Sequence, residues 1–153
     1  MTAARPLSAD VVAFIAQRNS AYFATSGGEG QPYVQHRGGP AGFLRVLDAK
    51  TLAFADYAGN RQYVTVGNLA NNDRAFLFFM DYAAGRRLKL WGRAHVVRDD
   101  AELFARVRDP DYDAAVEQAI VFTLSAWEWN CSRHIPKLVP AGESDSPPRR
   151  PMT

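Results

Sequence analysis

Residues 87–97 alternate between two kinds of side chain, and this alternation constrains the fold more than any other feature of the sequence. One set of alternate positions is apolar or small: Leu88, Leu90, Gly92, Ala94 and Val96. The other set is polar or aromatic: Arg87, Lys89, Trp91, Arg93 and His95. A two-residue period is typical of a β-strand with one buried face and one outward face. The segment is therefore predicted to be a long strand of a sheet covered on one side.

Six further segments have the composition and length of strands, and turns or short helices separate them. The expected strands are residues 20–25, 31–37, 43–47, 51–56, 74–81 and 119–126. The expected helices are residues 8–19, 60–72 and 99–108. Closing such a sheet on itself removes its exposed edges. The sequence therefore predicts a mainly β fold, a small antiparallel barrel with flanking helices.

The chain has 153 residues, of which 47% are hydrophobic, and this suffices for one domain with its own core. We expect that domain to span residues 1–139 and the Pro-rich polar residues 140–153 to form a disordered tail. The net charge of +2 does not favour a nucleic-acid or membrane partner. No apolar run approaches the ~18 residues of a membrane span, and no secretory signal is recognisable. A single cysteine, Cys131, fits a cytoplasmic location.

A polar turn joins the expected strand 51–56 to the expected helix 60–72. Asn60 and Arg61 lie at the start of that helix, where free N–H groups and an arginine together can hold a phosphate. Arginine supplies 15 of the 18 basic residues, and its planar group suits bidentate contacts with oxyanions. Asn60 capping the helix and Arg61 lying in solvent is an equally open interpretation. The sequence leaves open whether this turn binds a phosphate or only caps the helix.

Two other strand ends carry candidate binding residues. His36 and Arg37 end one strand and lead into glycines that let the backbone approach a flat ligand or adopt a turn. Asp56 ends another strand, where its carboxylate can accept hydrogen bonds from ligand hydroxyls or from backbone donors of the turn. The residues alone leave both roles open.

The order of these segments resembles the pyridoxamine 5′-phosphate oxidase-like FMN-binding split-barrel superfamily. The stretches that carry the resemblance are QHRGGPAGF, DYAGNRQY, GNL, RRLKLWGRA and AWEWNCSRHIPKL, and they cover roughly residues 8–134. The resemblance implies a split barrel, FMN as cofactor, and a homodimer with two flavins at the interface. It also implies an oxidoreductase that acts on a small molecule, with hydride chemistry supplied by the flavin.

The resemblance also implies a set of cofactor-binding residues. By motif position, Asn60 and Arg61 hold the flavin phosphate, Gln62 replaces a second basic residue of many oxidases, and Arg87 contacts the flavin. Trp127 and Asn130 correspond to residues that approach the flavin from the partner chain. Together with the strand-end candidates, the predicted cofactor site is His36, Arg37, Asp56, Asn60, Arg61, Gln62, Arg87, Trp127 and Asn130.

Several alternatives remain open. A deazaflavin needs the same phosphate-binding groove as FMN, and a non-catalytic flavin- or haem-binding barrel is possible, with His36, His95 or His134 as haem ligand. A zinc site lacks enough ligands. We expect a substrate other than pyridoxamine phosphate, because the oxidases carry further basic residues toward the C-terminus that this sequence lacks.

Overall fold

The computed structural model describes residues 5–57 and 63–141, and it contains every predicted helix and strand. The helices are α1 (Ala9–Ala16), α2 (Tyr63–Asn71) and α3 (Ala101–Val107). The strands are β1 (Ser20–Ser26), β2 (Pro32–Gly38), β3 (Arg45–Asp48), β4 (Thr51–Tyr57), β5 (Arg74–Asp81), β6 (Arg86–Val97) and β7 (Val116–Asn130). Of the predicted tail, residues 142–153 lie outside the described residues.

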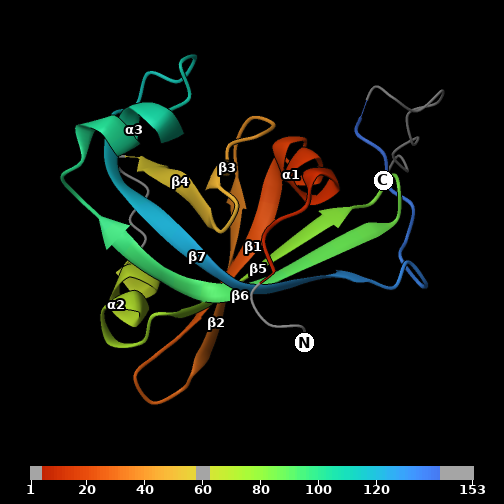
Figure 1. The fold of residues 1–153 in the computed structure, drawn as a ribbon, viewed down its shortest axis with the longest axis horizontal. Coiled ribbons are helices and arrows are strands. Elements are labelled where there is room, and N and C mark those ends of the chain that lie inside the picture. The colour runs from red at the N-terminus through yellow and green to blue at the C-terminus, as the bar shows by residue number, and fades with distance from the viewer. Residues whose placement is uncertain (1–4, 58–62, 142–153) are drawn as a thin grey trace, which may run out of the picture.

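The seven strands form one sheet in the order β2-β1-β5-β6-β7-β4-β3. Every pair of neighbours is antiparallel. The sheet curls strongly, so that β2 and the β3–β4 pair approach each other from its two ends (Figure 1). In the described part of the chain, side chains and not backbone hydrogen bonds connect these two ends. The predicted split antiparallel barrel is confirmed.

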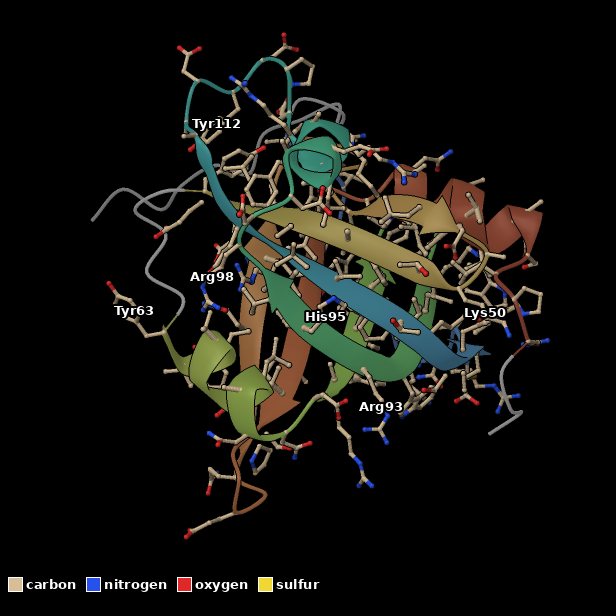
Figure 2. All side chains as sticks on the ribbon, turned by 60° about the vertical axis from the view of Figure 1, so that its left-hand side comes forward. Lys50, Tyr63, Arg93, His95, Arg98 and Tyr112 are labelled. Carbon is tan, nitrogen blue, oxygen red and sulfur yellow. The ribbon has the colours of Figure 1, made fainter. Side chains whose placement is uncertain are left out.

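Strand β6 has the two faces that its sequence predicts. Leu88, Leu90 and Ala94 are buried, whereas Arg93 and His95 are exposed and project from the outside of the sheet (Figure 2). A bulge in the pairing of β6 with β7 lies between Trp91 and Gly92. The alternation along β6 continues past the bulge, because the extra residue, Ser125, lies in β7.

The main core lies inside the curled sheet. Helix α1 contributes Val11, Phe14 and Ile15, which are buried at the helical spacing that the sequence shows. The largest fully buried side chains of the strands are Phe23, Leu52, Phe54, Leu77, Phe79, Leu88, Leu90, Ile120 and Phe122. Every central strand therefore buries its alternate residues against the others, which is what a closed sheet requires.

A second, smaller core lies on the outside of the sheet under α3. It contains Val107 with Ala53, Ala119 and Val121 of β4 and β7. The Asp100 side chain caps α3 by accepting a hydrogen bond from the Leu103 backbone N–H at 2.9 Å. Helix α3 therefore covers β4 and β7 and holds the segment that follows it, residues 108–112, beside the end of β4.

Helix α2 contacts the strands through polar side chains. Thr65 bonds Gln35 of β2 at 2.9 Å, and Asn68 donates to Thr25 of β1 at 3.0 Å. Asn72, directly after the helix, donates to Ser26 at 2.8 Å. These bonds fix the helix that follows residues 58–62 to the β2 side of the sheet. None of the helices in the described ranges is long and apolar enough to cross a membrane.

Candidate functional site

A cavity of about 500 Å³ lies between the two ends of the curled sheet. It is bounded by the end of β2, the loop that follows, β4 and the segment after α3. Its lining residues are His36, Arg37, Gly38, Gly39, Pro40, Phe43, Arg45, Phe54, Ala55, Tyr57, Val107, Asp109 and Tyr112. This volume falls within the ~300–1,000 Å³ of small-molecule sites. The cavity is therefore the candidate functional site.

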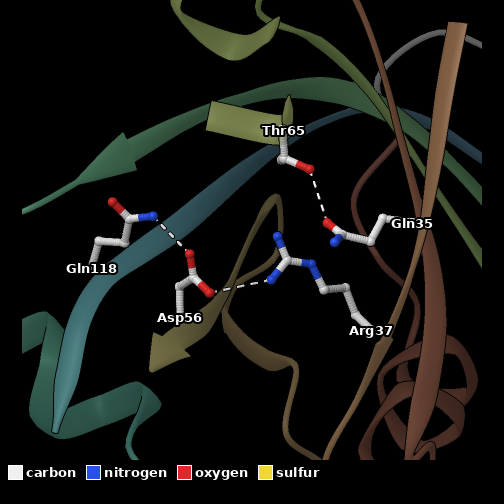
Figure 3. A network of polar contacts seen from close by, with 5 residues as sticks. All are labelled: Gln35, Arg37, Asp56, Thr65 and Gln118. Carbon is white, nitrogen blue, oxygen red and sulfur yellow. Dashed lines mark hydrogen bonds and ion pairs between the residues drawn. The ribbon is translucent and has the colours of Figure 1, made fainter. Parts of the chain in front are cut away.

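A buried polar network connects the two ends of the sheet at this cavity (Figure 3). Arg37 of β2 donates from Nη1 to Oδ1 of Asp56 in β4 at 3.4 Å, and both side chains are buried. Gln118 of β7 donates from Nε2 to Oδ2 of Asp56 at 2.7 Å. Because β2 and β4 are not neighbours in the sheet, this ion pair is a tertiary contact that helps to close the barrel.

The Arg37 guanidinium is only partly satisfied by this network. Its side chain is 5% exposed, and Nε and Nη2 have no hydrogen-bond partner among the residues that the structure describes. Burial lowers the pKa of Arg37, and the charge of Asp56 opposes that shift. Native proteins rarely leave buried donors unpaired, and such groups often mark functional positions. Arg37 is therefore the cavity residue that most strongly indicates a functional site.

Aromatic rings lie around the cavity. Tyr57 and Tyr112 meet edge to face with their centroids 4.7 Å apart, and the Tyr57 hydroxyl accepts a hydrogen bond from the Asp109 backbone N–H at 2.9 Å. On the other side, His36 packs edge to face against Tyr22 at 5.6 Å. The site thus combines two arginines, Arg37 and Arg45, with flat apolar walls. This combination suits a planar ligand with an anionic group.

The comparisons with known proteins agree with this architecture. The family profile described as pyridoxamine 5′-phosphate oxidase matches residues 7–143. The chain belongs to the pyridoxamine 5′-phosphate oxidase family. A comparison with curated proteins gives no match.

Solved structures of the pyridoxamine 5′-phosphate oxidase fold are similar to this chain at low sequence identity. HupZ of Group A Streptococcus is 15% identical with a TM-score of 0.64, and the match covers 79% of this chain and 92% of HupZ. An FMN-binding protein from Syntrophomonas wolfei is 12% identical with a TM-score of 0.56, covering 74% and 78%. An F420 reductase is 19% identical with a TM-score of 0.52, covering 75% and 94%. At these identities the likeness establishes the fold.

Three of the predicted site residues meet at the cavity. His36 and Arg37 line it, and Asp56 lies directly behind Arg37. The Asp56 carboxylate accepts hydrogen bonds from the side chains of Arg37 and Gln118, a structural role that differs from the predicted contact with backbone donors of the turn, and its contact with ligand hydroxyls stays a prediction. The predicted phosphate-binding residues Asn60, Arg61 and Gln62 lie outside the described residues, and their role stays a prediction.

The other three predicted residues are placed along the ends of β6 and β7, and none of them lines the cavity of its own chain. Arg87 donates from Nε to the Cys131 carbonyl oxygen at 3.2 Å and bonds the same oxygen through Nη2. Asn130 pairs with Arg87 in the sheet. Trp127 is buried, donates to the Pro6 carbonyl oxygen at 3.1 Å and lies under the Arg5 guanidinium at 3.7 Å. The contacts of Trp127 favour a packing role within the chain, and the cofactor-binding roles of Arg87 and Asn130 stay predictions.

The sequence reasoning missed several residues of the cavity and its network. Arg45, Tyr57 and Tyr112 line the cavity, and Gln118 completes the buried network. Arg45 follows a glycine-rich loop and Tyr57 lies at the end of a predicted strand, so both could have been chosen by the criteria that selected Arg37 and Asp56. No such criterion would have selected Gln118 or Tyr112, because both lie between a predicted helix and a predicted strand.

The outer face of the sheet carries a cluster of aromatic side chains, some of them exposed and others half-buried. Cross-strand pairing forms two rows: Val34, Ala24, Phe76, Trp91 and Ala126 in one, and His36, Tyr22, Phe78, Lys89 and Glu128 in the other. Phe76 and Trp91 meet at 5.2 Å, and Val34 is 60% exposed. We call these ten positions the aromatic face. It extends from the cavity edge at His36 to the β7 edge at Glu128.

Proposed function

We propose that this chain is an FMN-binding flavoprotein that acts as an oxidoreductase on a small molecule. The observation that carries the proposal is the cavity with two arginines at the end of β4, directly before the segment that contains Arg61. A protein of the same fold from Syntrophomonas wolfei is described as FMN-binding. A flavin, when bound, accepts and donates a hydride.

The residues present fit such a cofactor. Arg45 and the predicted Asn60–Arg61 turn supply cationic and N–H donors for a phosphate, and Tyr57 and His36 supply flat surfaces beside it. Phe43 and Phe54 keep the inner wall apolar, which excludes water from a bound ring. The work of these residues is to bind, orient and cover the cofactor.

We also propose that the chain forms a homodimer through the aromatic face. In a two-fold interface the same surface lies on both protomers, so that one edge of it faces the opposite edge of the partner. The His36 edge of one protomer would then lie near the β7 edge of the other, where Arg87 and Asn130 are located. This arrangement would bring the two groups of predicted cofactor residues together in one site.

A Val34→Glu variant tests the proposed dimer. Val34 is exposed in the monomer, so the substitution leaves the core intact but places a charge within the buried surface of the dimer. We expect the dissociation constant of the dimer, measured by analytical ultracentrifugation, to be at least about tenfold higher than that of the unmodified chain. Leu138→Glu, at an exposed apolar position outside the aromatic face, is the matched control and should dissociate like the unmodified chain. Equal dissociation of the Val34 and Leu138 variants would contradict the assignment of the interface.

The absorption spectrum of the freshly purified protein, with mass identification of any small molecule released on denaturation, tests the cofactor. We expect a flavin spectrum, or its recovery when FMN is added to colourless protein. Tighter binding of F420 than of FMN in parallel titrations would favour the deazaflavin reading, for which the F420 reductase neighbour is the support. A Soret band would indicate haem. Failure to bind any flavin would contradict the proposed cofactor.

An Arg61→Ala variant tests the phosphate contact. We expect FMN affinity to fall by about 1.5–3 kcal/mol, roughly 10- to 100-fold, because a charged hydrogen bond to the phosphate is lost. Riboflavin, which lacks the phosphate, should bind both proteins equally. The melting temperature of the flavin-free protein should not change, since Arg61 would act on the ligand. Unaltered FMN affinity would place Arg61 outside the site.

A further inference from the structure

One wall of the cavity is a connection that few contacts hold to the body of the protein. Residues 108–115 join α3 to β7 and project from the rest of the molecule (Figure 1). Two of them, Asp109 and Tyr112, line the cavity. Among the described residues, the hydrogen bonds of positions 109–113 either stay within the connection or reach Tyr57. The attachment of this wall therefore depends on one side chain.

The loop on the opposite side of the cavity is held more firmly. The N–H groups of Gly39 and Gly42 donate to the carbonyl oxygens of Asn19 and Arg18, each at 3.0 Å. Gly39 also packs against Phe43, because a Cβ atom added to Gly39 would lie 2.7 Å from the Cβ of Phe43. Backbone bonds and close packing thus fix this loop, and the wall beyond α3 is the one that can move.

Residues 109–112 form a turn with hydrogen bonds of its own, which we call the gate turn. The Tyr112 backbone N–H donates to the Asp109 carbonyl oxygen at 3.2 Å, and the Asp111 backbone N–H donates to Oδ1 of Asp109 at 3.0 Å. On either side of it the chain is anchored, since Val107 is buried in the small core and Val116 pairs with β4. The gate turn can therefore move as a unit between fixed ends, as segments with few buried contacts do.

A single side chain, Tyr57, joins the gate turn to β4. Its hydroxyl accepts the hydrogen bond from the Asp109 N–H at 2.9 Å, and its ring meets the ring of Tyr112 with the centroids 4.7 Å apart. Tyr112 is itself 51% exposed. One neutral hydrogen bond and one edge-to-face contact are weak enough to break and re-form reversibly.

From these contacts we propose that the gate turn controls passage into the cavity and that the Tyr57 hydroxyl holds it closed. The inference rests on the proposed function, because it takes FMN as the molecule that passes, and it adds how exchange of that cofactor is controlled. Opening breaks the bond between Asp109 and Tyr57 and exposes the Asp109 N–H to water, so no donor is left buried. Since opening precedes both entry and exit, the strength of this bond affects both rates.

A Tyr57→Phe variant tests the gate, because it keeps the ring and removes the hydroxyl. We expect the association and dissociation rate constants of FMN, measured by stopped-flow flavin fluorescence, each to rise about three- to tenfold, the range for one neutral hydrogen bond. Their ratio, Kd, should change far less than either rate constant. Hydrogen exchange of residues 108–113 should become faster as well. Tyr82→Phe, in the turn between β5 and β6 and away from the cavity, is the control and should change neither the rates nor the exchange.

Unchanged rate constants in Tyr57→Phe protein that binds FMN would overturn the gate and leave the proposed function intact, and faster hydrogen exchange alone would not rescue it. Weaker FMN binding with an unchanged association rate constant would mean that the hydroxyl contacts the cofactor, which also overturns the gate. A protein that binds no flavin would contradict the proposed function and the gate together.

Discussion

Replacing Gly92 with alanine is expected to destabilise the fold by about 3 kcal/mol or more, the upper range for overpacking a core. A Cβ atom at this position would lie 2.2 Å from the Thr123 carbonyl oxygen and 2.7 Å from Cζ of Phe122. The first atom belongs to the backbone of β7, and the second to a fully buried ring, so neither can move away cheaply. Urea unfolding should show a lower midpoint with an unchanged slope.

Gly67→Ala is the matched control for this prediction. Gly67 lies within α2, and a Cβ added there would meet no heavy atom within 4 Å. The same substitution should therefore stabilise the protein by about 0.5–1 kcal/mol, because alanine loses less backbone entropy in a helix. A Gly92→Ala protein as stable as the unmodified one would mean that β6 and β7 do not approach as closely as described.

Asp56→Asn is expected to cost about 3–5 kcal/mol, the range for breaking one half of a buried ion pair. The substitution preserves the shape of the side chain but leaves the buried Arg37 cation without a counter-charge. It also alters the contact that joins β2 to β4 across the gap in the sheet. Thermal and urea unfolding of the flavin-free protein measure this loss.

Asp73→Asn provides the comparison, since Asp73 pairs with Arg93 at the surface and both side chains are more than half exposed. Exposed pairs contribute about 0–1 kcal/mol, so this variant should stay close to the unmodified stability. Similar losses in the two variants would show that the Arg37–Asp56 pair has no special part in closing the barrel.

The elements with a clear period were predicted well from the sequence. Strand β5 has the predicted bounds, 74–81, and β6 begins one residue before the predicted 87–97. Strand β7 is the main difference, because it spans Val116–Asn130 and not only residues 119–126. Its ends are set by pairing: Val116 and Gln118 pair with β4, and Trp127 to Asn130 pair with β6. Such extensions depend on neighbours that a local pattern does not contain.

Several residues of the candidate site could be predicted individually from the sequence, but the contacts between them could not. Arg37 and Asp56 each stood out at a strand end, yet their contact depends on the curling of a seven-stranded sheet whose ends are not paired with each other. Arg87 shows the opposite case, since it contacts the Cys131 carbonyl oxygen within its own chain. Under the proposed dimer, which of these residues share a ligand would depend on the partner chain, and a single sequence carries no local signal for that.

The place of the cavity has a consequence for how occupancy and stability are related. Elsewhere around the barrel, ladders of backbone hydrogen bonds join each strand to the next, but along the seam between β2 and β4 the connections within residues 5–57 and 63–141 are made by side chains. A molecule seated there touches both margins of the sheet at once. Such a molecule would bridge the gap in the barrel, so that ligand binding would also stabilise the closed form of the sheet.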